Sequence, residues 1–158
     1  MTGEEIQAFL GAQRAFFNSG ATLSVDFRIK SLRKLYDAVK AHEDDIHAAL
    51  TADLGKSAYE GFMCESGLAL TEISYMIKHT RKLARRTTVR TPLAQFASHS
   101  FTQAVPYGNT LVMSPWNYPF LLTIDPLADA IAAGNTVILK PSAYSPATSS
   151  IIERIVAE

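Results

Sequence analysis

Two short segments constrain the fold of this chain more than any other feature. Residues 114–119 read Ser-Pro-Trp-Asn-Tyr-Pro and follow an apolar run at 110–113, while residues 140–142 read Lys-Pro-Ser and follow a second apolar run at 136–139. Short apolar runs that end in turn residues are typical of buried strands. An apolar helical pattern lies between them and ends at Gly134. We therefore predict a strand, a helix and a second, parallel strand.

This unit would bring Asn117 and Lys140 to the edge of a sheet where ligands bind in α/β proteins. The Asn117 amide could donate to an oxyanion. It could equally be a turn residue that bonds its own backbone, with Trp116 as ordinary core. Lys140 could bind a ribose or a phosphate, or simply close a strand. A helix starting near Ser145 would add free amides for an anion, but no glycine-rich phosphate loop is present. Spacing alone leaves these alternatives open.

The helix between the two strands has a predicted packing face and predicted ends. Pro126, after Asp125, is predicted to lie in the first turn of this helix, and Gly134 to end it. The packing face is predicted to hold Leu122, Leu127, Ile131 and small residues.

Residues 1–92 show helical periodicity. A capping box of Thr2 and Glu5 begins the first helix and Gly20 ends it. Ser24 caps a second helix, in which Arg28 is predicted to lie off the apolar face. An acidic cluster at 43–45 begins a third helix, which Gly55 ends. A fourth runs from 59 to about 86. Its predicted buried face consists of Phe62, Met63, Ala69, Leu70, Ile73, Met76 and Ile77.

The fourth helix also carries the side chains that most invite a functional interpretation. Its end is basic, which is typical of a solvated helix C-terminus and also of a nucleic-acid patch. The 15 basic and 15 acidic residues of the whole chain cancel, so we expect no nucleic-acid partner. Cys64 has no nearby base in the sequence and is expected to be structural. The four histidines have no metal-ligand spacing, so no metal site is expected.

Composition indicates a globular chain. Hydrophobic residues make up 47% and charged residues 19% of the 158 residues. The start lacks a signal-peptide pattern and the single cysteine allows no internal disulfide, so we expect a cytoplasmic protein. The apolar runs are too short for a membrane span. The last helical pattern stops at Glu158 without a cap, which predicts that the chain is the beginning of a larger protein.

The segments 115–120 and 130–142 together resemble the aldehyde dehydrogenase superfamily, in particular its class 3 branch. The segments 52–56 and 65–78 are similar to the N-terminal helices of that branch. The resemblance implies an α/β fold, in which N-terminal helices precede the first βαβ unit of an incomplete, Rossmann-like NAD(P)-binding domain. It places a helical part of the cofactor domain at 1–92, an oligomerisation hairpin at 93–107, and the nucleotide-binding part at 108–158.

The resemblance also implies roles for single residues. Asn117 matches the asparagine whose amide holds the oxyanion. Tyr118 matches a residue that lines the substrate site. The positions that match cofactor contacts are Ser114, Pro115, Trp116, Lys140 and Ser142. The implied cofactor is NAD or NADP, and the implied partners are an aldehyde substrate and a second copy of the chain in a homodimer.

Two departures from the family pattern matter. Ala143 stands where many members have a glutamate that repels a 2′-phosphate, which predicts that NADP is accepted at least as readily as NAD. The nucleophilic cysteine, the general-base glutamate and the pyrophosphate turn are absent from these residues, and Cys64 does not match the nucleophile. We therefore expect the N-terminal part of an NAD(P)-dependent aldehyde dehydrogenase, inactive by itself. The alternatives are a non-catalytic interaction module that pairs with another aldehyde dehydrogenase chain, and a nucleic-acid binder built on the basic helix end.

Overall fold

The N-terminal half is built from helices. Within residues 2–158, which a computed structural model describes, these are α1 (Gly3–Asn18), the short turn η1 (Ala21–Leu23), α2 (Val25–Ala41), α3 (Glu43–Leu54), α4 (Ala58–Gly61), the π-turn η2 (Phe62–Ser66) and α5 (Gly67–Leu83). The predicted caps are confirmed, because Thr2 and Ser24 each accept a backbone N–H three residues on, at 3.3 Å. Gly20 and Gly55 end helices with positive φ angles of 76° and 67°.

The C-terminal part contains the predicted βαβ unit. Strand β3 (Asn109–Met113) leads into α6 (Leu121–Ala133), and β4 (Thr136–Lys140) leads into α7 (Pro146–Ala157). The two strands are parallel, with Asn109 opposite Thr136 and Met113 opposite Lys140. Gly134 ends α6 at a φ of 92°, as predicted. The order of helices and strands confirms the predicted α/β class.

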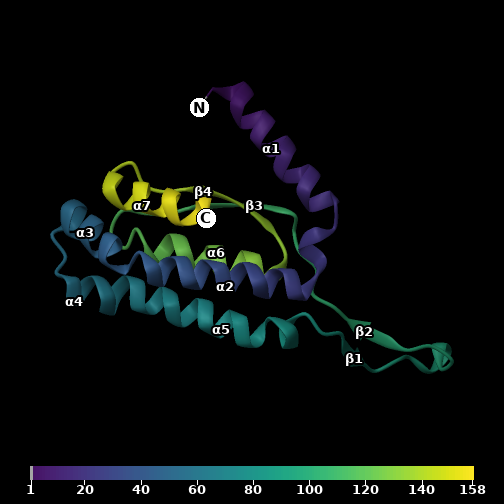
Figure 1. The fold of residues 1–158 in the computed structure, drawn as a ribbon. Coiled ribbons are helices and arrows are strands. Elements are labelled where there is room, and N and C mark those ends of the chain that lie inside the picture. Colours follow the sequence, from purple (N-terminus) through teal and green to yellow (C-terminus); the bar gives the residue numbers. More distant parts are fainter. Residues whose placement is uncertain (1) are drawn as a thin grey trace.

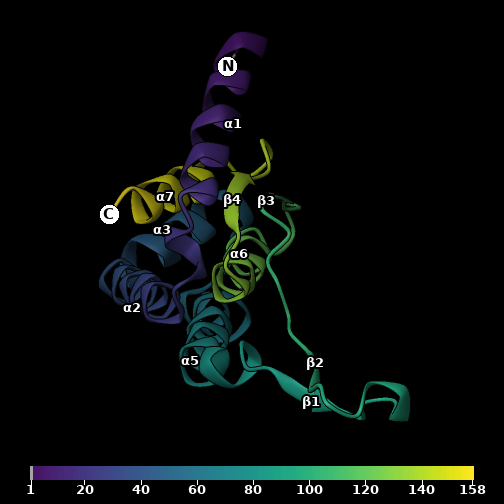
Figure 2. The same ribbon diagram turned by 90° about the vertical axis from the view of Figure 1, so that its right-hand side faces the viewer.

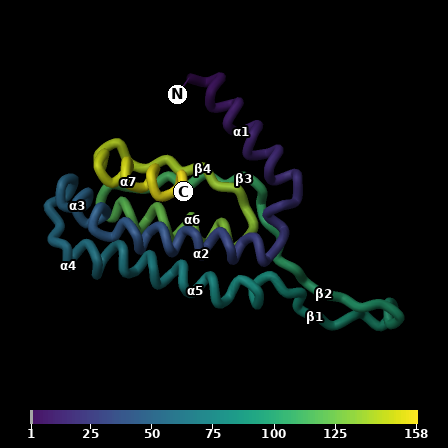
Figure 3. The backbone as a smooth tube through the Cα atoms, viewed as in Figure 1, coloured from purple at the N-terminus to yellow at the C-terminus, as the bar shows by residue number. Residues whose placement is uncertain are grey.

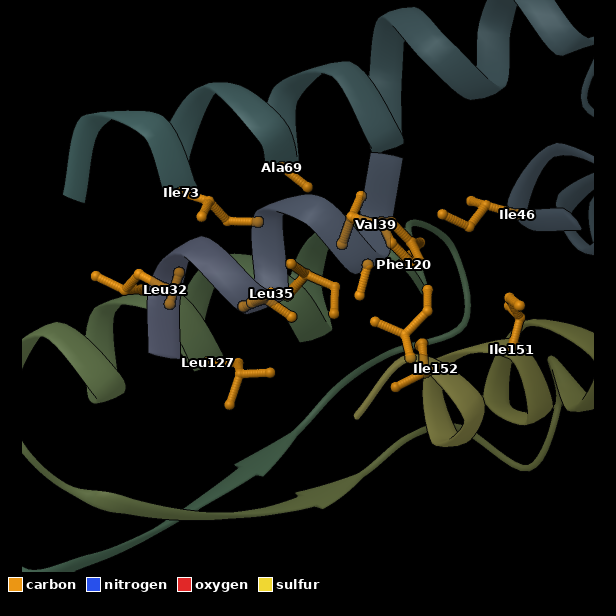
Figure 4. Close-up of a cluster of buried hydrophobic side chains, with 14 of the residues drawn as sticks. Leu32, Leu35, Val39, Ile46, Ala69, Ile73, Phe120, Leu127, Ile151 and Ile152 are labelled. Atoms are coloured by element: carbon orange, nitrogen blue, oxygen red, sulfur yellow. The ribbon is translucent and has the colours of Figure 1, made fainter. Parts of the chain in front are cut away.

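The core lies where α2, α3, α5, α6 and α7 meet. In Figures 1 and 2, α5 lies on one side of α6, and the β3–β4 sheet lies on the other. Figure 4 shows the buried side chains that join these elements, and it labels Leu32, Leu35, Val39, Ile46, Ala69, Ile73, Phe120, Leu127, Ile151 and Ile152. The core thus fastens the N-terminal helices to the start of α6, directly beside the 114–119 segment.

The predicted buried face of the fourth helix is partly wrong. Phe62 and Met63 are exposed, whereas the charged Glu65 and the polar Ser66 are fully buried. The reason is η2, in which the Gly67 N–H bonds the Phe62 carbonyl and one extra residue enters the turn. The extra residue rotates the earlier part of the helix relative to α5, so a constant period of 3.6 residues assigns the wrong face there.

Two predictions about α6 are also wrong. Pro126 lies inside the helix, because α6 begins five residues earlier, at Leu121. Leu122 is exposed, and Ile124, which the prediction left out, is buried. Both differences arise because distant side chains hold the start of the helix, as described below.

Arg28 is buried rather than off the packing face. Its guanidinium donates to the carbonyls of Thr22, Leu23 and Ala132, the last at 3.3 Å and near the end of α6. Burial lowers the pKa of Arg28 from its ordinary value. A cation at this position complements the negative C-terminal end of the α6 dipole.

Two segments leave large apolar side chains exposed. The antiparallel hairpin of β1 (Thr87–Val89) and β2 (Ser100–Thr102), with the turn η3 (Leu93–Gln95) between them, extends away from the helices (Figures 1 and 3). Strand β1 lies before Pro92, within the range 1–92 that the resemblance assigns to the helical part. Helix α1 has no buried residue. Leu111 and Met113, predicted to lie in a buried strand, are also exposed, because one face of the two-stranded sheet has little packed against it.

No helix within residues 2–158 is both long enough and apolar enough to cross a bilayer.

Candidate functional site

The two segments that follow the strands lie next to each other. Met113 and Lys140 are opposite in the parallel pair, and the Ser114 N–H donates to the Lys140 carbonyl at 3.3 Å. The chain leaves β3 toward Asn117 and leaves β4 toward Ser142 at this same edge. The structure therefore confirms the predicted neighbourhood of the two motifs.

The segment from Ser114 to Leu121, which we call the Asn117 loop, is held at several backbone atoms. The Thr123 hydroxyl donates to the Pro119 carbonyl at 2.6 Å. Because that uses the only proton of Thr123, the Ser114 hydroxyl donates to Thr123 Oγ1, also at 2.6 Å. The two prolines further restrict the backbone of the loop. Its conformation is thus fixed without using the side chain of Asn117.

The exposed part of the loop contains the residues that the sequence singled out. Trp116 is 54% exposed, so its interpretation as ordinary core is wrong for this chain. Pro115, Asn117 and Tyr118 are also exposed, whereas Phe120 is completely buried. Within residues 2–158 the Asn117 side-chain amide makes no hydrogen bond, so the interpretation as a turn residue that bonds its own backbone has no support. Its two N–H groups are free to donate to a ligand.

Beneath the loop lies a buried ion pair that the sequence reasoning missed. Lys56 and Glu65 are bonded to each other, with 9% and 0% of their side chains exposed. The second oxygen of Glu65 accepts the N–H groups of Phe120 and Leu121 at 2.9 and 3.0 Å. A carboxylate at this position satisfies the first amides of α6 and complements the positive end of its dipole.

Lys56 links this pair to the loop. Its ammonium group donates to the Asn117 carbonyl at 3.2 Å and lies 4.2 Å from the centre of the Tyr118 ring. The three N–H directions of the lysine are therefore directed to a carboxylate, a carbonyl and an aromatic face. The only sequence signal was that Lys56 and Glu65 lie in the segments that resemble the family, and this signal did not indicate a role.

On the other side of the edge, Lys140 is exposed, and its side chain has no hydrogen bond within residues 2–158. Ser142 is buried, and its hydroxyl accepts the Tyr144 N–H at 3.2 Å while its carbonyl accepts from Ser145 and Ser149. Lys140 and Ser142 line a groove of about 990 Å³ whose walls come from β4, α7 and Phe9 of α1. Asn117 is not among the residues that line it.

The prediction of free amides at the start of α7 is wrong. The Asp53 carboxylate accepts the N–H of Ala147 at 3.1 Å and the N–H and hydroxyl of Thr148 at 2.7 and 2.8 Å. Asp53 comes from the end of α3, which packs on α7. A phosphate at this helix start would have to displace a carboxylate that the fold itself supplies.

A carboxylate cluster lies where α5 meets α6. The pKa of Asp125 is raised to about 6, mainly by burial and also by the nearby charges of Glu72 and Asp129. One oxygen of Asp125 is buried without a partner in residues 2–158. The pKa values of Glu72 and Asp129 are also raised, mainly by burial. Glu72 belongs to α5 and the two aspartates to α6, so none of them is part of either motif.

The basic end of α5 is partly neutralised within the chain. Arg81 forms an ion pair with Asp26 on α2. Arg86 donates to Gln103 at 2.9 Å and lies over the Phe101 ring of the hairpin. These local partners favour the interpretation as a solvated helix end.

Comparison with known proteins assigns the family. The model of the aldehyde dehydrogenase family matches residues 1–158. The 4,4′-diaponeurosporen-aldehyde dehydrogenase of Staphylococcus aureus is 41% identical over 145 residues, which are 92% of this chain and 32% of that protein. The dimeric NADP-preferring aldehyde dehydrogenase of Canis lupus familiaris is 40% identical over 146 residues, again 92% of this chain and 32% of the relative.

Members named as family 3 match as well. Those from Arabidopsis thaliana and Rattus norvegicus are 36–38% identical over 90–99% of this chain and 28–32% of their own length. A solved structure of Staphylococcus aureus AldH in a substrate-bound state has a TM-score of 0.94 and 39% identity, covering 96% of this chain and 33% of that one. The chain spans about a third of the length of the relatives that it matches.

The family model, the shared fold and the strand-end motifs agree: the chain belongs to the aldehyde dehydrogenase family and is similar to the N-terminal portion of its class 3 members.

Proposed function

We propose that this chain is the N-terminal part of an NAD(P)-dependent aldehyde dehydrogenase that oxidises aldehydes to carboxylic acids. The observation that carries the proposal is the Asn117 loop, whose backbone is bonded at Pro119, Phe120 and Leu121 while the Asn117 amide faces outward. A rigid backbone with an unused amide donor suits the stabilisation of a developing negative charge on oxygen.

Asn117 would donate an N–H to the aldehyde oxygen as that oxygen becomes negative. A well-placed donor of this kind lowers the barrier by about 3 to 4 kcal/mol. Trp116 and Tyr118 are exposed beside it and would supply apolar surface to the substrate or to the adjoining part of the cofactor.

The residues on the other strand end fit the ribose half of NAD or NADP. Lys140 has an exposed ammonium group at the rim of the groove, and Val137, Leu139 and Ile152 give the groove apolar walls. When bound, NAD(P) supplies the acceptor for the hydride that leaves the aldehyde carbon. Ser142 would contribute through the turn that it holds, because its hydroxyl already accepts the Tyr144 N–H.

These residues do not provide a nucleophile. Cys64 lies in the π-turn η2, with Met63 and Glu65 as neighbours, rather than at either strand end. A thiolate elsewhere in the complete enzyme would attack the aldehyde, and water would later release the acid. We therefore expect the 158-residue chain alone to oxidise no aldehyde.

The reading frame beyond residue 158 provides the test. We expect a continuing frame that encodes a cysteine nucleophile, and a full-length product that forms NADH or NADPH with an aldehyde. The full-length Asn117→Ala variant should lose about 100- to 1,000-fold in kcat. A frame that stops at residue 158 would contradict the proposal, and so would NADH or NADPH formation by the purified 158-residue chain that Asn117→Ala abolishes.

A second candidate function rests on the exposed hairpin. Leu93, Phe96 and Tyr107 are 85%, 86% and 97% exposed, in and next to the hairpin. Exposed apolar groups of this kind are typical of an interface. In the first candidate they would contact the second subunit of a homodimer, and in the second they would pair this chain, without catalysis, with another aldehyde dehydrogenase. Sedimentation of the chain with and without a full-length homologue tests them: a stoichiometric complex would favour the second candidate, and aggregation or unfolding of the chain alone would favour the first.

A further inference from the structure

The Lys56–Glu65 pair lies under the Asn117 loop and contacts both of its halves. Lys56 bonds the carbonyl of Asn117 itself, and Glu65 bonds the N–H groups of Phe120 and Leu121, 55 and 56 residues away in sequence. Two oppositely charged groups thus fix a carbonyl and two amides of one short loop. No other charged side chain in residues 2–158 forms a hydrogen bond with the backbone of this loop.

The backbone that carries the pair is itself tightly fixed. Lys56 follows Gly55, which has a φ of 67°, and its carbonyl accepts the Thr51 hydroxyl at 2.6 Å. Glu65 faces inward because η2 inserts an extra residue into its turn. A side chain at Gly67 would lie 2.7 Å from the Phe62 carbonyl, so the π-turn requires a glycine there. The turn at Gly55 and the π-turn η2 together direct the side chains of Lys56 and Glu65 toward the loop.

The position of the Asn117 amide depends on the loop backbone. Within residues 2–158 the amide has no hydrogen bond of its own, so no other group orients it directly. The carbonyl of the same residue is bonded to Lys56. An amide donor acts on an oxyanion only at 2.7–3.1 Å, and a displacement of about 1 Å can reduce a rate by about 100-fold. Small movements of the Asn117 backbone would therefore carry over directly to the amide.

We propose that Lys56 and Glu65 are positioning residues, which hold the Asn117 amide at the place where the aldehyde oxygen becomes negative. This inference rests on the proposed function, because it takes Asn117 as the oxyanion donor. The pair would act mainly on the rate of the chemical step, since Lys140 and the groove, which would bind the ribose half of NAD(P), have no bond to it.

The first experiment compares rate with binding in the full-length enzyme. Lys56→Met should lower the single-turnover rate of NADH or NADPH formation about 10-fold, while the Kd for the cofactor changes less than about twofold. Lys56→Arg, which keeps the charge, should restore part of the rate. Lys30→Met is the matched control, because Lys30 is an exposed lysine of α2. An unchanged rate in a folded Lys56→Met variant would overturn the proposal.

Lys56→Met leaves the buried charge of Glu65 unpaired and could lower the rate simply by destabilising the fold, so a second variant removes both charges. Lys56→Met combined with Glu65→Gln removes both charges and keeps an oxygen that can accept an amide of α6. It should show a thermal midpoint closer to that of the wild type than Lys56→Met does, and still lose about 10-fold in rate. A stable double variant with a wild-type rate would equally overturn the proposal.

A double-mutant cycle with Asn117 separates this inference from the function on which it rests. In an Asn117→Ala background, Lys56→Met should cost less than about twofold, because the group that it positions is gone. An equal loss in both backgrounds would show that Lys56 acts only on overall structure. If Asn117→Ala alone left the rate unchanged, the assignment of Asn117 as donor would be the part that fails.

Discussion

The first backbone N–H groups of α6 and of α7 need acceptors, and a different carboxylate provides them at each helix. Both helices follow a parallel strand, and in both a carboxylate from the N-terminal helices accepts the first backbone amides, Glu65 at α6 and Asp53 at α7. Neither helix therefore offers these amides to a phosphate. In this chain, ligand binding at the sheet edge has to rely on side chains such as Asn117 and Lys140.

The two starts differ in burial and in what is attached to them. Glu65 is fully buried and paired with Lys56, which extends the bonded network to Asn117. Asp53 is partly exposed, and within residues 2–158 it has no basic partner. The side of the proposed oxyanion donor is thus rigid, whereas Lys140 on the cofactor side is free to adapt. This difference would fit the two proposed roles, because Asn117 has to hold an oxyanion at a fixed position, whereas Lys140 can bind the cofactor while its side chain moves.

Removal of the buried carboxylate should have the largest effect. Glu65→Leu leaves the Lys56 charge unpaired and two amides of α6 unsatisfied, so the free energy of unfolding should fall by about 3 to 5 kcal/mol. Urea unfolding at pH 7 measures this fall. Glu60→Leu, at an exposed position of α4, is the control and should change stability by less than about 0.5 kcal/mol. A loss for Glu65→Leu as small as that of the control would remove the distinction between the two helix starts.

The equivalent change at α7 should have a smaller effect. Asp53→Ala removes the acceptor for two amides and the Thr148 hydroxyl, but it leaves no buried cation behind. The expected loss is about 1 to 2 kcal/mol in the same unfolding experiment. Asp53→Asn, which keeps one acceptor oxygen, should lose less. A loss for Asp53→Ala equal to that of Glu65→Leu would show that burial and pairing do not separate the two sites.

A negative charge added beside Lys140 should change the relative affinity for NADP and NAD. Ala143 is exposed and lines the groove together with Lys140. In the full-length enzyme, Ala143→Glu should weaken NADP relative to NAD by about 10-fold, because a carboxylate would repel a 2′-phosphate. Fluorescence titration with both cofactors measures the ratio, and Ala143→Gln controls for size. A strong NAD preference that the substitution leaves unchanged would contradict this expectation.

Asp125 of α6 tests the opposite case to Glu65, because it is a partly buried carboxylate without a basic partner in residues 2–158. The pKa of Asp125 is raised to about 6, so its contribution to stability is fully present below its ordinary pKa, near 4, and is lost as pH rises through 6. Asp125→Asn should therefore stabilise the protein at pH 7 by about 1 kcal/mol, after discounting for solvent screening. The gain should vanish near pH 4. Unfolding curves at both pH values check it, with the exposed Asp37→Asn as control, and a gain that is equal at both would be contrary to the raised pKa.

Local signals in the sequence were sufficient for the elements themselves. The capping box at Thr2, the glycine stops and the two apolar runs predicted helices and strands that the structure contains. Such signals work because caps and turns use atoms a few residues apart. The start of α6 was mispredicted for the opposite reason. Pro126 resembled a first-turn proline, yet the bonds that begin the helix come from Glu65, 56 residues earlier than Leu121.

The sequence by itself determined the first three helices and the βαβ unit, the neighbourhood of Asn117 and Lys140, and, through the resemblance, the family. Only the tertiary structure decided which charges are buried and what they hold. Hydrophobic periodicity assigns a charged residue to the surface, so it could not place Glu65, Lys56 or Arg28 in the interior. A buried charge is stable only when partners from distant parts of the chain surround it, and those partners meet only in the folded protein.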